Sequence, residues 1–186
     1  MPFSKLEFPG VFIFEPRVFE DSRGYFFEAY NEQTFSTGGI KTRFIQDNQS
    51  FSRKGTIRGL HYQLEPWAQA KLVRVLQGVI LDVVVDIRKR SPTYGRVLSV
   101  ELSGENKKQL FIPRGFAHGF SVLSESADIL YKCDQLYNKE SESGILYCDP
   151  DLQIDWKVDP GAETVSEKDR QLPVFSSAKN NFEFKG

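Results

Sequence analysis

Hydrophobic and polar residues alternate along much of this chain, and the clearest run covers residues 79–88. Positions 79, 81, 83, 85 and 87 are aliphatic, whereas Asp82, Asp86 and Arg88 fall on the other face. A period of two is that of a β-strand, because successive side chains point to opposite sides of a sheet. We therefore predict a strand with one dry side and one polar side.

Shorter runs of the same kind recur along the chain, separated by turn-forming Gly, Pro and Ser residues. They cover residues 11–14, 25–30, 43–51, 71–76, 96–102, 109–112, 116–123 and 129–133. Helical periodicity is nearly absent, apart from a turn or two at 32–36. Many short strands at near-regular spacing predict an all-β antiparallel barrel or jelly roll. With 186 residues and no linker or repeat, we expect one domain spanning residues 1–186.

Charge and composition narrow the possible partners. The net charge is −1, from 24 basic and 25 acidic residues, which argues against nucleic acid held through its phosphates. Small anionic ligands stay open, because a few arginines suffice for a diphosphate. The longest apolar run is interrupted by Asp82, so no membrane span is expected. The two cysteines lack CxxC spacing and the first residues lack an apolar signal core, which indicates reduced thiols in a bacterial-type cytoplasm.

The only two histidines, His61 and His118, lie in two segments rich in Arg, Gly and aromatic residues, 56–63 and 113–120. A side chain that titrates near neutrality is a candidate base, although each histidine could instead be a half-buried packing residue. The neighbours of His61 favour a site, because Arg58, Gln63 and then Lys71 place a cation, an amide and an ammonium close by in the chain.

The residue pattern favours acid–base chemistry without a metal. Metal-binding cupins use a His-x-His pair, and here Gln63 stands where the second histidine would fall. Nucleophile motifs and glycine-rich phosphate loops are also missing from the sequence. A histidine base commonly needs a carboxylate partner, and Asp169 in the segment 166–170 is the candidate. The alternative for Asp169 is an ordinary charge at a helix start or turn.

Seven segments, in order along the chain, carry a resemblance to a known family. They are residues 19–28, 44–50, 57–63, 71–75, 112–120, 131–133 and 166–169. Together they closely resemble the dTDP-4-dehydrorhamnose 3,5-epimerase family, from about residue 8 to about residue 173. A local departure is the stretch 65–69, where Trp67 is unusual and puts the shape of that loop in doubt.

The resemblance implies a cupin-type jelly roll, forming a cytoplasmic homodimer that uses no metal or organic cofactor. It also implies a dTDP-linked 4-keto-6-deoxyhexose substrate, inverted at C3 and C5, to supply rhamnose for a bacterial surface polysaccharide such as lipopolysaccharide O antigen. By position, His61 is the base, Asp169 its partner, Tyr131 the proton donor and Lys71 the cation near the keto oxygen. The positions that match those holding the nucleotide or sugar are Arg23, Glu28, Gln46, Asp47, Asn48, Arg58, His118, Glu142 and Lys168. The aromatic residues Phe19, Phe26 and Tyr137 lie beside charged residues of these segments and are expected to line a pocket.

Two other functions remain open at the level of sequence. A sibling enzyme that inverts only C3 or only C5 would keep the same catalytic residues. A non-catalytic nucleotide-sugar-binding cupin should have lost the base or the acid, and this chain has lost neither.

Overall fold

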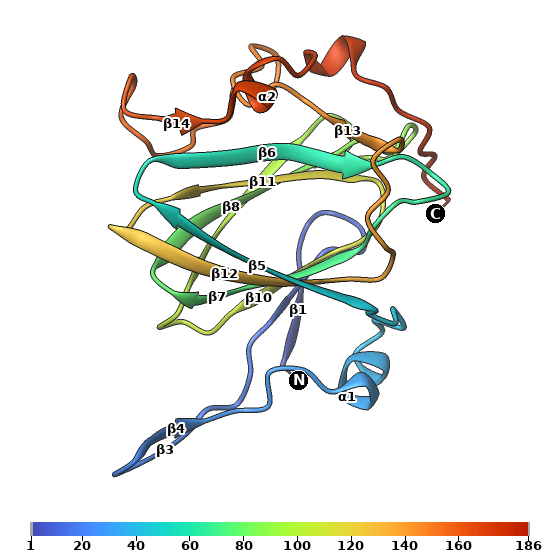
Figure 1. Ribbon diagram of the computed structural model, residues 1–186. Coiled ribbons are helices and arrows are strands. Elements are labelled where there is room, and N and C mark those ends of the chain that lie inside the picture. Colours follow the sequence, from blue (N-terminus) through green and yellow to red (C-terminus); the bar gives the residue numbers. More distant parts are fainter. Residues whose placement is uncertain (1, 186) are drawn as a thin grey trace.

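The computed structural model describes residues 2–185, and Figure 1 shows two β-sheets facing each other across the middle of the protein. In spatial order, the first sheet contains β1 (Phe3–Lys5), β2 (Phe12–Phe14), β10 (Gln109–Ile112), β7 (Lys71–Gln77), β12 (Ser126–Cys133) and β5 (Gln46–Arg53). The second contains β13 (Glu142–Gly144), β6 (Thr56–Gln63), β11 (Phe116–Val122), β8 (Val79–Asp86) and β9 (Val97–Ser103), with β14 (Thr164–Val165) beside β6. All pairs are antiparallel except β14 with β6.

The remaining elements lie outside the two sheets. They are the hairpin β3 (Phe19–Asp21) and β4 (Gly24–Phe26), the helices α1 (Glu32–Thr37) and α2 (Glu167–Arg170), and the 3-10 helix η1 (Phe175–Ser177). The predicted all-β class with short helices is confirmed. The expected strand at 25–30 is wrong beyond Phe26, because residues 27–30 run as irregular chain into α1, which Asn31 caps by accepting from Gln33 N and Thr34 N. None of the helices in residues 2–185 is long and apolar enough to cross a membrane.

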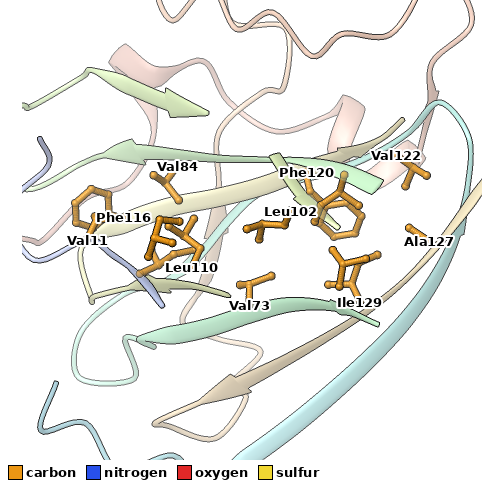
Figure 2. Packing of buried hydrophobic residues seen from close by; sticks show 14 of the residues in the cluster. Val11, Val73, Val84, Leu102, Leu110, Phe116, Phe120, Val122, Ala127 and Ile129 are labelled. Atoms are coloured by element: carbon orange, nitrogen blue, oxygen red, sulfur yellow. The ribbon is translucent and has the colours of Figure 1, made fainter. Parts of the chain in front are cut away.

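A hydrophobic core fills the space between the sheets. Figure 2 shows side chains from β7, β10 and β12 meeting others from β8, β9 and β11. Val73, Val84, Leu102, Leu110 and Ile129 are completely buried there. Alternation explains how one strand contributes to this core, because every second residue points inward.

The strand over residues 79–88 differs from its prediction. Its odd positions, such as Val83 and Val85, pack beneath a second cluster that includes Trp156 and Phe182 of the C-terminal segment. Its even positions face between the sheets, where Asp82 and Asp86 are completely buried. The strand therefore has two dry sides where one was predicted, because the C-terminal segment covers its odd positions and the opposite sheet covers its even positions.

The C-terminal tail, residues 177–185, packs on the second sheet. Phe182 is 5% exposed, and backbone hydrogen bonds join Lys89 to Phe182 and Phe184. Gly186 lies outside the described residues.

Candidate active site

A cleft enters the barrel between β5 and β6 and divides into two compartments. The larger holds about 760 Å³ and includes Arg58, His118, Lys168 and Asp169 in its wall. The smaller holds about 370 Å³ and is lined by a largely different set: Gln46, Asn48, His61, Tyr62, Gln63, Gln69, Lys71, Tyr131, Tyr137 and Glu142. Three residues line both compartments: His61, Lys71 and Tyr131. They therefore mark the junction where the two compartments meet.

A register shift in β6 places Arg58 and His61 on the same wall. His61 pairs with His118 on β11, whereas Arg58 pairs with Phe120, so three steps along β6 match two along β11. The extra residue reverses the alternation locally, which regular strand geometry would not do. Gly59 permits the shift: its φ is +113°, and a Cβ there would lie 2.7 Å from Gly119 Cα. The same glycine donates its N–H to Asp169 Oδ2 at 3.2 Å.

His61 and Asp169 form a hydrogen-bonded pair. His61 Nε2 lies 2.7 Å from Asp169 Oδ1, and the carboxylate is buried. Asp169 sits on α2, whose first turn is capped when Ser166 Oγ accepts from Asp169 N. Burial raises the pKa of Asp169. The hydrogen bond and charge of His61, together with hydrogen bonds from Gly59 and Ser166, outweigh burial and hold the pKa of Asp169 below its usual value. Asp169 is therefore an ionised partner for a histidine that gains a proton.

Lys71 and Tyr131 project from neighbouring strands, β7 and β12. Lys71 Nζ lies 6.0 Å from the centre of the Tyr131 ring. Burial lowers the pKa of Lys71, against the opposing influence of Cys133 and Asp82. Burial raises the pKa of Tyr131, so its hydroxyl keeps its proton. The junction thus combines a base, a hydroxyl donor and a cation.

A second histidine–aspartate pair lies behind the larger compartment. His118 Nε2 lies 3.0 and 2.9 Å from the two oxygens of Asp82. Burial lowers the pKa of His118 despite the neighbouring Asp82, and Lys71 and His61 lower it further. His118 is therefore neutral near pH 7, with Nε2–H donated to Asp82.

Polar side chains connect the mouths of the two compartments. Tyr137 donates its hydroxyl to Glu142 Oε2 at 2.9 Å, and Lys168 Nζ lies 2.7 Å from the same oxygen. Burial raises the pKa of Glu142, but Lys168 and Tyr137 outweigh it and lower the pKa overall. In the wall of the larger compartment, Arg58 donates from Nε to Ser52 Oγ at 3.0 Å.

The structure brings most of the predicted site residues together and leaves five apart. Asp47 points outward and pairs with Lys132 at 3.0 Å. The other four are Phe19, Arg23, Phe26 and Glu28, on or just after the β3–β4 hairpin, and they line surface hollows that share no residue with the two compartments. Figure 1 shows this hairpin projecting from the sheets, far from α2.

Some residues of the cleft were missed by sequence reasoning. Ser50 and Ser52 line the larger compartment, and Ser50 Oγ is the buried side-chain oxygen without a hydrogen-bond partner among residues 2–185. Asp82 was seen only as a polar strand position. Its signal was an acid within an aliphatic run, a placement that burial permits only with a partner.

The residues present do not form a metal site. Within residues 2–185, no group of three His, Cys, Asp or Glu side chains is placed to hold an ion. Gln63, at the position of a cupin ligand, uses its amide in hydrogen bonds to Trp67 O, Leu136 O and Asn138 N. Independence from metal stays a prediction, tested below.

A half-buried base paired with a buried carboxylate, a hydroxyl donor and a cation in one cleft of a jelly-roll barrel define an acid–base enzyme. The profile of the dTDP-4-dehydrorhamnose 3,5-epimerase family matches residues 5–177. The chain belongs to this family and is an epimerase, as the sequence resemblance predicted.

Relatives and solved structures agree with this assignment. The chain is 56% identical over 155 residues to the dTDP-4-dehydrorhamnose 3,5-epimerase of Shigella flexneri, covering 83% of this chain and 86% of the relative. The crystal structure of that enzyme from Elizabethkingia anophelis superposes with a TM-score of 0.89 at 50% identity, covering 94% and 96%. The structure of the Legionella pneumophila 3,5-epimerase in complex with dTDP-4-keto-L-rhamnose superposes with a TM-score of 0.90 at 46% sequence identity. The match covers 94% of this chain and 93% of that one. The cupin-type jelly roll is thereby confirmed.

Proposed function

We propose that this enzyme converts dTDP-4-dehydro-6-deoxy-D-glucose to dTDP-4-dehydro-L-rhamnose by inverting C3 and then C5, or the reverse. The observation that carries the proposal is the meeting of His61, Lys71 and Tyr131 where the two compartments join. A sugar at this junction would have the base, the acid and the cation around one ring, with its nucleotide reaching along the larger compartment.

The residues account for the proton transfers. His61 bonds to Asp169 through Nε2, which leaves Nδ1 to take a proton from the carbon next to the C4 ketone. Asp169 stabilises the imidazolium that results. Lys71 stabilises the negative oxygen of the enolate, an effect worth about 3 to 4 kcal/mol when one such donor is removed from an oxyanion site. Tyr131 returns a proton to the opposite face. Since the C4 ketone acidifies both neighbours, one set of residues serves C3 and C5.

The nucleotide would be held by the larger compartment and by a second copy of the chain. Arg58 and Lys168 supply positive charge for the diphosphate. The hairpin residues Phe19 and Phe26 are 50% and 69% exposed, as expected for aromatic side chains that a second subunit would cover. The hairpin would lie over the cleft of a partner subunit, where Arg23 and Glu28 would complete the nucleotide site.

The wider setting follows from the same reaction. We propose a single-domain enzyme that works in the cytoplasm as a homodimer, without metal or organic cofactor. Its product would supply rhamnose for a surface polysaccharide such as O antigen. These points rest on the family resemblance, and the homodimer also rests on the position of the hairpin.

Proton NMR in D2O tests the reaction directly. The purified protein is incubated with dTDP-4-dehydro-6-deoxy-D-glucose, and deuterium is followed at each carbon. We expect deuterium at both C3 and C5 and formation of the L-sugar. Exchange at only one carbon would establish the mono-epimerase instead, and binding without exchange would establish a non-catalytic sugar-nucleotide-binding protein.

A further inference from the structure

Gln63 is a buried amide whose polar atoms all serve loops rather than the strand it belongs to. It follows His61 by two residues on β6 and is 5% exposed. Its Nε2 donates to Trp67 O at 2.6 Å and to Leu136 O at 3.2 Å, and its Oε1 accepts from Asn138 N at 2.7 Å. Both N–H groups and the oxygen of the amide are therefore engaged.

Two of these hydrogen bonds, those to Leu136 O and Asn138 N in the 134–141 loop, lie on either side of Tyr137. Leu136 and Asn138 are its direct neighbours in the chain, and Tyr137 N itself donates to Gln46 Oε1 at 3.2 Å. The ring, by contrast, is 57% exposed, with one side-chain bond to Glu142. The direction in which the ring points is thus set mainly by its backbone, and Gln63 holds that backbone from both sides.

Tyr137 lines the smaller compartment together with His61, Lys71 and Tyr131. We propose that Gln63 is a positioning residue for the epimerisation: it ties the 64–70 and 134–141 loops together so that Tyr137 forms a wall against the sugar ring. This inference rests on the proposed function. It also explains why an amide stands two residues after His61, because an amide offers two donors and an acceptor, which an imidazole cannot match.

Replacement of Gln63 by Glu separates this role from simple packing. The carboxylate has the same shape, but when ionised it places an acceptor oxygen where Nε2 donated to the carbonyl oxygens of Trp67 and Leu136. Protonation of the introduced carboxylate restores one donor. We expect Gln63→Glu to lower kcat/KM at least about tenfold at pH 7.5, and part of the loss to be recovered at acid pH relative to wild type. Affinity for dTDP, bound in the larger compartment, should change less than about twofold.

A double-mutant cycle shows whether the effect passes through Tyr137. In a Tyr137→Ala background, Gln63→Glu should cost little further activity, because the wall that it positions is gone. If the double variant instead loses activity by the product of the two single losses, the inference is overturned. Asn181→Ala is the matched control: it frees the same 64–70 loop at Glu65 but touches nothing near Tyr137, and should keep activity within about twofold.

A readout independent of turnover completes the test. With 3-fluorotyrosine at position 137, we expect Gln63→Glu to shift or broaden the ¹⁹F resonance and Asn181→Ala to leave it unchanged. An unchanged resonance in Gln63→Glu would overturn the inference even if the wild-type enzyme turned over normally. Absence of wild-type turnover with a shifted resonance would instead count against the proposed function alone.

Discussion

His61 Nε2 lies 2.7 Å from Asp169 Oδ1, although 108 residues separate the two in the chain. The bond crosses from β6 to the short helix α2, and the same carboxylate accepts from Gly59 N. One aspartate therefore holds both the base and the irregular backbone that aims it.

The pair predicts the result of replacing Asp169 by Asn. An amide cannot stabilise the imidazolium formed when His61 takes a proton, so we expect kcat to fall about 10²- to 10⁴-fold. Binding of dTDP should persist, and circular dichroism should show a retained fold. His61→Ala should be at least as severe. Wild-type turnover in Asp169→Asn would reduce Asp169 to a helix-start charge.

Tyr131→Phe should separate proton removal from inversion. His61 can still form the enolate and return solvent deuterium to the original face. We therefore expect deuterium wash-in with unchanged configuration, while formation of the L-sugar falls by at least about 10²-fold. If wash-in vanishes too, in a variant that binds dTDP, Tyr131 acts before or during proton removal. Near-normal inversion would remove it as the acid.

The lowered pKa of Lys71 predicts an alkaline limit to activity. A lysine is charged below its pKa, so burial makes Nζ lose its charge at a lower pH than an exposed lysine would. We expect kcat to decline as pH rises, before Tyr131, whose pKa is raised, gives up its proton. The alkaline decline should also appear in the rate of deuterium wash-in catalysed by Tyr131→Phe, because that variant keeps Lys71. In Lys71→Arg the decline should move to higher pH, because arginine keeps its charge to higher pH than lysine. A limit unmoved in Lys71→Arg would assign it to another group.

Chelation should leave turnover intact. The amide of Gln63 is hydrogen-bonded to loop residues, and each of the two histidines pairs with an aspartate. Among residues 2–185, no set of side chains is therefore placed to bind a divalent ion. Prolonged EDTA treatment followed by dialysis should not change kcat. Activity that disappears and then returns with Zn²⁺, Mn²⁺ or Fe²⁺ would contradict the metal-free mechanism.

Mixing two inactive variants tests the placement of the hairpin. In a homodimer with exchanged hairpins, the cleft of an Arg23→Ala subunit would receive Arg23 from a His61→Ala partner. Statistical mixing should then restore about a quarter of wild-type activity, since half of the dimers are mixed and each has one intact site. No recovery after refolding the variants together would place Arg23 in its own subunit's site or outside any site.

The sequence by itself determined most of the core strands and their approximate limits. Period-two patterning depends only on neighbouring positions, so the core strands from β7 to β12 lie close to their predicted limits. The family resemblance likewise pointed to His61, Lys71, Tyr131 and Asp169, which the structure brings together in one cleft. Their catalytic roles stay predictions.

Only the tertiary structure decided what depends on distant parts of the chain. Alternation places Arg58 and His61 on opposite faces, and the shift at Gly59 against β11 brings them to one wall. Asp82 became a buried partner of His118 because the C-terminal segment covers the aliphatic face of β8, which leaves the polar face between the sheets. In each case the local pattern was correct, but burial and register are set by contacts between segments that no local pattern contains.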